Sequence, residues 1–402
     1  MRLFFAVPDV YPPWRLDVDE LFARQMPTLG IEITWSMRRN QPGSCEQAEY
    51  QGQTAYLPLR LSANGLAGTL VNQFAQYLCE LVLFLRLLLG RRYDIIQVRD
   101  GRYLFALLGW IAARFRGAKF VYWSSYPFPE HMLEVAASKY GAMRLLHLFR
   151  GRVYGFYVYR FIMRVADHVF VQSDQMLRDV AGYGVPIAKM TSVPMGVPPR
   201  LLGWTGSNPS HIKAGKIVYV GTLARVRRMG VLIEAFHLVR QRNPDAHLVM
   251  VGDGVTPDDR AELEYLMFRL GLIEAVTFTG FVPMEEAWNH AASAELCLSP
   301  FYPTFVLRST SPTKLVEYMA LGKPVVANDH PEQAAILAES GAGLCVSWGV
   351  QSFADAILDL LANPAKAQAM GARGPAWVAA NRTYDKLAAQ VYTSYMVLLG
   401  RA

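Results

Sequence analysis

Short apolar runs alternate with longer helical patterns along almost the whole chain. The runs are rich in Val and Ile and bounded by Gly or Pro, which is typical of buried strands in a parallel sheet. We expect such strands at residues 2–8, 31–35, 94–98, 119–123, 168–172 and 190–194, and again at residues 216–221, 247–252, 276–280, 295–300, 323–327 and 343–346. Because helical segments lie between most of them, the pattern predicts doubly wound sheets.

The alternation is interrupted once, at residues 196–215, which are rich in Gly, Pro and Ser and show no period. A chain of 402 residues also exceeds one ordinary hydrophobic core. We therefore predict an α/β fold with two Rossmann-like, doubly wound domains that face a deep cleft. The first should span residues 1–200 and the second residues 201–380, with a final helix at residues 381–402 that crosses back to the first. Ligands are expected at the carboxyl ends of the strands, facing the cleft.

Cysteine spacing and hydropathy favour a reducing compartment and no membrane-spanning helix. The four cysteines, Cys45, Cys79, Cys297 and Cys345, lie far apart, so we expect neither a zinc site nor a disulfide framework. The apolar run at the start of the chain has the length of a strand, and no secretory signal is expected. The longest apolar stretch, residues 81–89, is interrupted by an arginine and falls short of the ~20 residues that span a bilayer.

Positive charge is concentrated in the first half of the chain. Residues 1–200 hold 23 Lys and Arg against 15 Asp and Glu, whereas residues 201–402 hold 17 against 18. Such asymmetry indicates an anionic partner surface for the first half.

The strongest basic segment is residues 135–166, which carry six basic and no acidic side chains. Aromatic residues interleave with the basic ones, at Tyr154, Phe156, Tyr157, Tyr159 and Phe161. This combination on a helix suits the headgroup layer of an anionic membrane, which the apolar helix at residues 71–92 could join. The membrane or acceptor contacts are assigned to Arg150, Arg152, Arg160 and Arg164. A core helix and an RNA-binding segment are the alternatives, but no nucleic-acid fold motif is present, and no nucleic-acid partner is expected.

The segment at residues 311–329 combines a helix start, a helix end and a strand. Ser311 and Thr313 can cap the helix, whose free N–H groups form an anion site together with Lys314. Glu317, one turn further on, can accept both hydroxyls of a ribose. The alternative is a capped helix with a surface Lys–Glu pair.

Two more strand ends carry residues suited to phosphate. Gly221 ends a strand and is followed by a loop with Arg225, Arg227 and Arg228, and guanidinium groups suit phosphate oxygens. Gly252 and Gly254 also close the strand at residues 247–252, a weak signal by itself. A solvated basic loop and a simple tight turn are the alternatives, but three such strand ends together favour a nucleotide pocket.

In order and spacing, the second half resembles the C-terminal domain of retaining, nucleotide-sugar-dependent glycosyltransferases of the GT-B fold, in particular the large group that builds bacterial glycolipids and polysaccharides. The segments that carry the resemblance are Y-V-G-T-L (219–223), V-L-I-E-A-F (231–236), L-V-M-V-G-D-G (248–254), F-T-G-F-V (278–282), L-S-P (298–300), K-L-V-E-Y-M-A-L-G-K-P-V-V-A (314–327) and A-G-L-C-V (342–346). The first half is similar more loosely, in Y-P-P after the first strand and V-P-M-G-V at residues 193–197.

The resemblance implies a role for each matching residue. Glu317 would bind the ribose, Arg227 the donor diphosphate, and the amides from Ser311 to Lys314 the distal phosphate and the sugar. The donor-binding set is Gly221, Thr222, Arg227, Gly252, Gly280, Phe281, Val282, Ser311, Thr313, Lys314 and Glu317, of which Gly280, Phe281 and Val282 would line the base pocket.

The chain departs from the family pattern in three places. Ser309 stands where the family often has a glutamate that touches the donor sugar, and Thr222 stands where an arginine is usual. Trp14, Arg15 and Leu16 replace a glycine pair after the first strand, and Arg15 could touch the phosphates instead. These departures leave room for a weak enzyme or a non-catalytic partner subunit.

For catalysis, the resemblance implies a histidine after a strand of the first domain. Ser124 and Ser125 occupy that place, with Glu130 and His131 further along and Asp100 after the preceding strand. Asp100 or Glu130 could orient an acceptor hydroxyl, whereas a lone histidine is more often structural.

We therefore expect a retaining, metal-independent glycosyltransferase, peripheral on the cytoplasmic face of the cell membrane. It would move a sugar from a UDP- or GDP-linked donor to a lipid-linked or polysaccharide acceptor, and no cofactor or metal ion would be required, because fixed positive charge stabilises the leaving diphosphate. The expected catalytic residues are Arg227, Lys314, Asp100 and His131. A sugar epimerase, a glycoside phosphorylase, a non-catalytic partner subunit and an RNA binder are the alternative functions.

Overall fold

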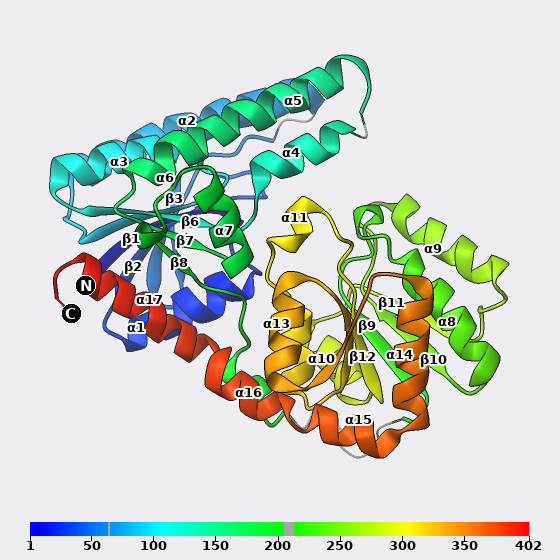
Figure 1. Cartoon of the computed structure of the whole chain (residues 1–402). Coiled ribbons are helices and arrows are strands. Elements are labelled where there is room, and N and C mark those ends of the chain that lie inside the picture. The colour runs from blue at the N-terminus through cyan, green and yellow to red at the C-terminus, as the bar shows by residue number, and fades with distance from the viewer. Residues whose placement is uncertain (63–64, 138, 205–212, 402) are drawn as a thin grey trace. The chain divides into compact units, whose positions relative to one another are not determined.

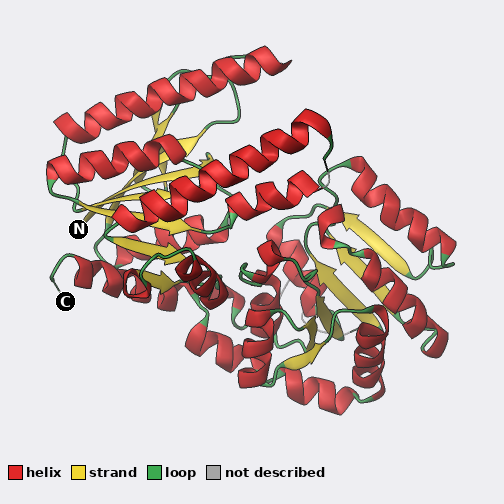
Figure 2. Ribbon diagram, turned by 45° about the horizontal axis from the view of Figure 1, so that its top comes forward, coloured by secondary structure: helices red, strands yellow, loops and turns green. Residues whose placement is uncertain are grey.

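The computed structural model describes residues 1–62, 65–137, 139–204 and 213–401, which form two compact units (Figure 1). The first unit comprises Met1–Pro194 and Tyr384–Ala402, and the second comprises Met195–Thr383. Of the expected linker at residues 196–215, the described residues fall within the second unit, and residues 205–212 lie outside the described part of the chain. In both units a sheet of mainly parallel strands is covered by helices on its two faces (Figure 2), so the predicted α/β class is confirmed.

The sheet of the first unit has eight strands in the order β3-β4-β2-β1-β5-β6-β7-β8, and every neighbouring pair is parallel except β3 and β4. The strands are β1 (Arg2–Val10), β2 (Glu32–Arg38), β3 (Glu46–Tyr50), β4 (Gln53–Leu57), β5 (Ile95–Arg99), β6 (Lys119–Ser124), β7 (His168–Val171) and β8 (Met190–Ser192). All six strands predicted for this half are present. Their carboxyl ends lie at one edge of the sheet, which brings the segments after β1, β5 and β6 together.

The antiparallel hairpin of β3 and β4 was not predicted. Its two-residue turn is Gln51-Gly52, and both residues have positive φ, of 51° and 73°. Tight hairpins require this backbone geometry, and Asn-Gly or Asp-Gly usually supplies it. Because glutamine stands at the first position, the usual sequence signal is missing.

Helices cover the two faces of this sheet with separate hydrophobic cores. The helical segments are η1 (Asp17–Gln25), α1 (Met26–Thr28), α2 (Gly65–Leu89), α3 (Tyr103–Arg116), α4 (Phe128–Ala137), α5 (Gly141–Gly155), η2 (Phe156–Ile162), α6 (Met163–Val165), α7 (Asp174–Gly182), η3 (Ile187–Lys189) and α17 (Tyr384–Leu398). One core joins the sheet to η1, α1 and α17, and the other joins it to α2, α3, η2, α6 and α7. The last helix of the chain thus packs on the first unit, where Tyr395 donates a hydrogen bond to Gln97.

The second unit is a six-stranded parallel sheet in the order β11-β10-β9-β12-β13-β14. Its strands, all six of them predicted, are β9 (Lys216–Val220), β10 (His247–Val251), β11 (Val276–Gly280), β12 (Leu296–Ser299), β13 (Val325–Asn328) and β14 (Gly343–Val346). Its helical segments are η4 (Pro199–Leu201), η5 (Arg225–Arg227), α8 (Gly230–Arg242), α9 (Pro257–Arg269), α10 (Met284–Ala292), α11 (Phe305–Arg308), α12 (Thr313–Ala320), α13 (Pro331–Ser340), α14 (Val350–Ala362), α15 (Pro364–Gly371) and α16 (Gly374–Asn381). Side chains of α8, α9 and α14 fill the core on one face, and side chains of α10, α12, α13 and α16 fill the other.

Within the described residues, none of the helices combines the length and the apolar composition needed to cross a bilayer.

Candidate functional site

Three glycines lie at the carboxyl ends of neighbouring strands in the second unit. Gly221 follows β9, Gly252 follows β10 and Gly280 ends β11. Gly252 has φ of +135°, and a Cβ atom there would lie 2.2 Å from the carbonyl oxygen of Gly221. Only glycine fits this approach of two strand ends. The three glycines thus let strand ends approach closely at the edge where parallel sheets bind ligands.

Lys314 is buried in the first turn of α12, with 8% of its surface exposed. Its ammonium nitrogen lies 4.4 Å from the ring centre of Phe301 and 5.3 Å from that of Tyr219. No carboxylate of the described residues lies within ion-pair distance of it. Burial, and secondarily the positive charge of Arg227, holds the pKa of Lys314 well below its usual range. The ammonium group therefore lies against two aromatic faces, which compensate only part of the cost of burying a charge.

The three arginines of the loop after β9 have different surroundings. Arg225 forms an ion pair with Glu262 at 2.6 Å, and Arg228 lies over the ring of Tyr302 at 4.6 Å. Arg227 is partly buried and close enough to act on the charge of Lys314. Of the three, Arg227 is therefore the one that shares a local site with Lys314, as predicted from the sequence.

Glu317 lies one turn after Lys314, at the wall of a cavity of about 170 Å³. The indole N–H of Trp288 donates a hydrogen bond to its Oε1 at 3.2 Å. Burial raises the pKa of Glu317 to about 7 despite this hydrogen bond and the nearby Lys314. The cavity is otherwise mostly apolar and is lined by Val220, Met284, Ala287, Trp288, Ala291, Tyr318 and Leu321. Since Lys314 is buried, Glu317 is partly buried, and no salt bridge joins them among the described residues, the alternative of a surface Lys–Glu pair is wrong.

The expected helix caps are also wrong. The N-cap position of α12 is Pro312, and no side chain accepts a hydrogen bond there. The hydroxyl of Ser311 instead accepts from the amide of Met195 and donates to Glu332, both at 2.9 Å. Ser311 lies one residue too early to cap the helix, and Thr313 is already its first residue. The first-turn amides of α12 are consequently not capped by a side chain.

The remaining donor-site candidates form the surroundings of this group. Phe281 is 70% exposed, and Val282 is partly buried against the core. The carbonyl of Thr222 accepts a hydrogen bond from the hydroxyl of Tyr219 at 3.2 Å, which fixes the turn after β9. Ser309 is almost fully buried and donates to the carbonyl of Phe305 at 3.3 Å.

In the first unit, Tyr126 links the two expected catalytic residues, Asp100 and His131. The amide of Tyr126 donates to the buried carboxylate of Asp100 at 3.0 Å, and its hydroxyl lies 3.2 Å from Nδ1 of His131. Burial raises the pKa of Asp100 and lowers that of His131. Glu130 accepts a hydrogen bond from the hydroxyl of Tyr159 at 2.7 Å and is itself buried. Asp100 thus holds the loop after β6 in place, and His131 stands beside it in its neutral form near pH 7.

The basic segment differs from its predicted arrangement. Its arginines Arg150, Arg152, Arg160 and Arg164 are all exposed, on α5, η2 and α6. Of the five aromatic residues, however, only Phe156 is strongly exposed, at 71%. The other four pack inward, on Tyr103, Trp110, Glu130 and Tyr183. The exposed apolar side chains come instead mainly from α5, namely Met143, Leu145, Leu146, Phe149 and Val153.

Solved structures with a similar arrangement of strands and helices identify the fold. Sucrose-phosphate synthase from Thermosynechococcus elongatus matches over 100% of both chains with a TM-score of 0.70 and 17% identity. HepE from Anabaena, solved with UDP and glucose, matches 99% of this chain and 100% of its own, also with a TM-score of 0.70 and 17% identity. The two Rossmann-like units therefore form a GT-B fold, as expected.

Family models cover both units. The model described as "Glycosyl transferase 4-like domain" matches residues 20–196, and that described as "Glycosyl transferases group 1" matches residues 214–363. The chain belongs to the glycosyltransferases that are built from these two domains.

Curated relatives match over part of their length. A GDP-mannose-dependent alpha-(1-6)-phosphatidylinositol monomannoside mannosyltransferase of Mycobacterium tuberculosis is 31% identical over 44% of this chain and 46% of its own. The amylovoran biosynthesis glycosyltransferase AmsK of Erwinia amylovora is 28% identical over 37% of this chain and 35% of its own. The matched region thus spans less than half the length of these relatives.

Proposed function

We propose that the protein is a retaining glycosyltransferase that moves a sugar from a nucleoside-diphosphate sugar to a lipid-linked or polysaccharide acceptor. The observation that carries the proposal is the buried Lys314, which forms no ion pair among the described residues and lies close to Arg227 at the carboxyl edge of the sheet. An unpaired buried charge is costly, and an anion that binds it recovers part of that cost. A diphosphate fits two adjacent cations and the uncapped amides at the start of α12.

The same geometry supports a role in bond cleavage. As the bond to the sugar breaks, negative charge develops on the leaving diphosphate, and fixed cations in a buried site stabilise it without reorganisation. Lys314 and Arg227 would supply this charge, so no metal ion is needed in the proposal. Glu317, oriented by Trp288, would accept the ribose hydroxyls next to them. The names of the relatives, which include a GDP-mannose-dependent mannosyltransferase, support a nucleotide-sugar donor.

For the acceptor, the first unit supports a lipid-linked substrate at an anionic membrane. Four exposed arginines and the exposed apolar residues of α5 lie on consecutive helical segments. Such a surface suits the headgroup layer, so we place the protein on the cytoplasmic face of the cell membrane. The relative that is named for a phosphatidylinositol monomannoside also supports a lipid-linked acceptor.

A transfer assay tests the proposal. The protein is incubated with labelled UDP- and GDP-sugars, a lipid extract as acceptor, and EDTA. The proposal predicts a glycolipid product whose anomeric configuration equals that of the donor. An inverted product contradicts the retaining part of the proposal, and transfer that occurs only when EDTA is left out contradicts the metal-independent part.

A second candidate is a partner subunit that binds the donor without transfer. It is favoured by Ser309, whose hydroxyl donates to a helix carbonyl where the family often has a sugar-binding glutamate. Donor binding with no product under any acceptor would support this candidate.

A further inference from the structure

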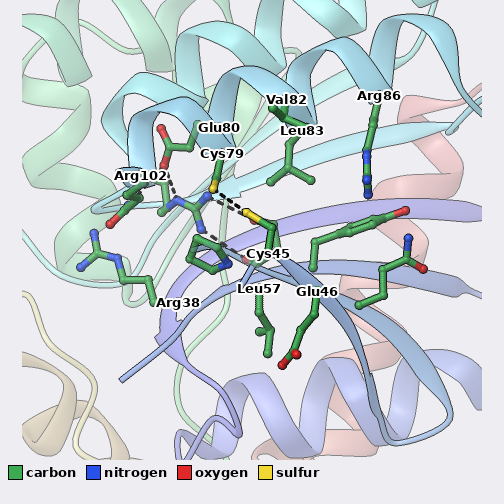
Figure 3. A pocket seen from close by; sticks show the side chains of 15 residues that line it. Arg38, Cys45, Glu46, Leu57, Cys79, Glu80, Val82, Leu83, Arg86 and Arg102 are labelled. Atoms are coloured by element: carbon green, nitrogen blue, oxygen red, sulfur yellow. Dashed lines mark hydrogen bonds and ion pairs between the residues drawn. The ribbon is translucent and has the colours of Figure 1, made fainter. Parts of the chain in front are cut away.

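The first unit contains a cavity of about 200 Å³ that is lined by α2, by the hairpin of β3 and β4, and by the ends of neighbouring segments (Figure 3). Apolar side chains such as Leu57 and Leu83 form part of the lining, together with the buried ion pair of Glu80 and Arg102 at 2.8 Å. Two cysteines, far apart in the sequence, meet in the same lining.

The Sγ atoms of Cys45 and Cys79 lie 3.0 Å apart, and their side chains point toward one another (Figure 3). Cys45 directly precedes β3 and is exposed, whereas Cys79 is on α2 and is partly buried. Both are free thiols, and 34 positions separate them. These two cysteines are thus far apart in the sequence but in contact in the folded protein.

We propose that Cys45 and Cys79 form a reversible disulfide, made by exchange with a small-molecule disulfide such as oxidised glutathione. The bond would fasten the start of the hairpin to α2 across the wall of the cavity. This inference does not depend on the transferase activity proposed above.

The exchange balances in two steps. The thiolate of Cys45 attacks one sulfur of oxidised glutathione, forms a mixed disulfide and releases one glutathione thiolate. Cys79 then loses its proton to solvent, and its sulfur attacks the sulfur of Cys45 and releases the second glutathione. Two protein thiols are oxidised to one disulfide, and one glutathione disulfide is reduced to two thiols.

Exposure sets the order of these steps. Cys45 is reached from solvent, whereas burial and the contact with Cys45 raise the pKa of Cys79 to about 11. The thiolate is the reactive form of a cysteine, so Cys45 reacts first and Cys79 resolves the mixed disulfide from contact distance. In a reducing compartment such bonds are typically transient and regulatory.

The disulfide would act on the structure around it. Cys79 precedes Glu80, which holds Arg102, and Arg102 donates to the carbonyl of Val7 at 3.0 Å. A bond between Cys45 and Cys79 closes a chain segment of 34 positions and restricts the unfolded chain. We therefore expect the oxidised protein to unfold at a higher temperature and the hairpin amides to exchange hydrogen more slowly.

The test is peptide mapping of the whole protein under non-reducing conditions after treatment with oxidised glutathione. The expected result is a cross-linked pair of peptides containing Cys45 and Cys79, lighter by two hydrogens and restored by dithiothreitol. Cys345→Ser, which removes an exposed cysteine of the second unit, should form the same cross-link. Glutathione that stays on Cys45 while Cys79 remains a free thiol would overturn the proposal, as would reaction of Cys345 alone.

A second variant separates the two steps. In Cys79→Ser, glutathione should remain attached to Cys45, and the rise in unfolding temperature on oxidation should disappear. A rise equal to that of the unmodified sequence would show that another site causes it and would overturn the proposal. If this variant does not fold, the peptide map of the unmodified protein still tests whether Cys45 and Cys79 form a disulfide.

Discussion

The indole N–H of Trp288 on α10 donates a hydrogen bond to the carboxylate of Glu317 on α12, at 3.2 Å and at the wall of a mostly apolar cavity. This bond opposes the effect of burial, because a donor to a carboxylate favours its charged form. Together with burial and the nearby Lys314, this aromatic side chain from a neighbouring helix therefore sets the charge state of Glu317 near neutral pH.

Trp288→Phe removes that donor and should raise the pKa of Glu317 above its value of about 7. If the carboxylate binds ribose hydroxyls, affinity for the nucleoside diphosphate near pH 7 should fall roughly three- to tenfold and recover at higher pH. Calorimetric titration across pH measures this. Trp377→Phe is the matched control, since the indole N–H of Trp377 has no hydrogen-bond partner among the described residues. An equal loss at every pH would contradict the role assigned to Trp288.

Stability should also depend on the protonation of Glu317. Its pKa is about 7 in the folded protein, against an ordinary value of 4.5, so the folded state binds the proton more tightly. The contribution of Glu317 to the free energy of unfolding should therefore be largest below about pH 4.5 and fall by about 2 to 3 kcal/mol as the pH rises to about 7.

Glu317→Gln has no proton to lose there and should flatten this part of the curve. Urea unfolding at about pH 5 and about pH 8 measures both proteins. If the free energy of unfolding changes equally with pH in the unmodified protein and in Glu317→Gln, other groups cause the pH dependence.

Lys314→Met should stabilise the free protein and weaken diphosphate binding. The pKa of Lys314 is lowered in the fold, so its charge costs stability at neutral pH and the cost fades as the pH rises toward the usual lysine pKa. Removing the charge should add about 1 kcal/mol or more to the free energy of unfolding near pH 7.

The control for Lys314→Met is Lys323→Met, at another buried lysine. Lys323 donates a hydrogen bond to the carbonyl of Ala294 at 3.0 Å, so this change should destabilise the protein. Chemical denaturation of both variants tests the contrast, and destabilisation by Lys314→Met would contradict it.

Neutralising Arg150, Arg152, Arg160 and Arg164 together should release the protein from anionic liposomes. Each exposed basic residue near such a surface contributes about 1 kcal/mol, so partitioning should fall by roughly two to three orders of magnitude. Liposome sedimentation measures this, with neutral liposomes for comparison. Neutralising Arg242 and Arg269, which are exposed on the second unit, should have little effect. Unchanged binding of the fourfold variant would show that these arginines do not face the membrane.

The parallel strands were predictable from the sequence because each is a short, largely apolar run between turn residues. The three strand-end glycines followed from the same pattern. The hairpin of β3 and β4 was not predicted, because Gln51 takes a positive φ without the usual asparagine or aspartate. Helix α12 was located correctly, but Ser311 binds Met195 and Glu332 instead of capping it.

Contacts between segments that are distant in the sequence could not be predicted from local patterns. Phe301, Tyr219 and Trp288 surround Lys314 and Glu317 from three different elements, and no spacing in the sequence brings them together. The contact between Cys45 and Cys79 was not predicted for the same reason, because 34 positions separate them in the sequence. The inward packing of Tyr154 and Tyr159 likewise depends on partners in other segments.

The most direct test of the central claim is a thermal-shift series with UDP, GDP and ADP in the presence of EDTA. A ligand that binds only the folded state raises its stability, by about 2.7 kcal/mol at a hundredfold excess over Kd. We predict a clear rise in unfolding temperature with at least one diphosphate, and a much smaller rise for Lys314→Met and for Glu317→Ala. Two results would contradict a donor site at Lys314 and Glu317. One is no rise in unfolding temperature with UDP, GDP or ADP, and the other is an equal rise in the unmodified protein and both variants.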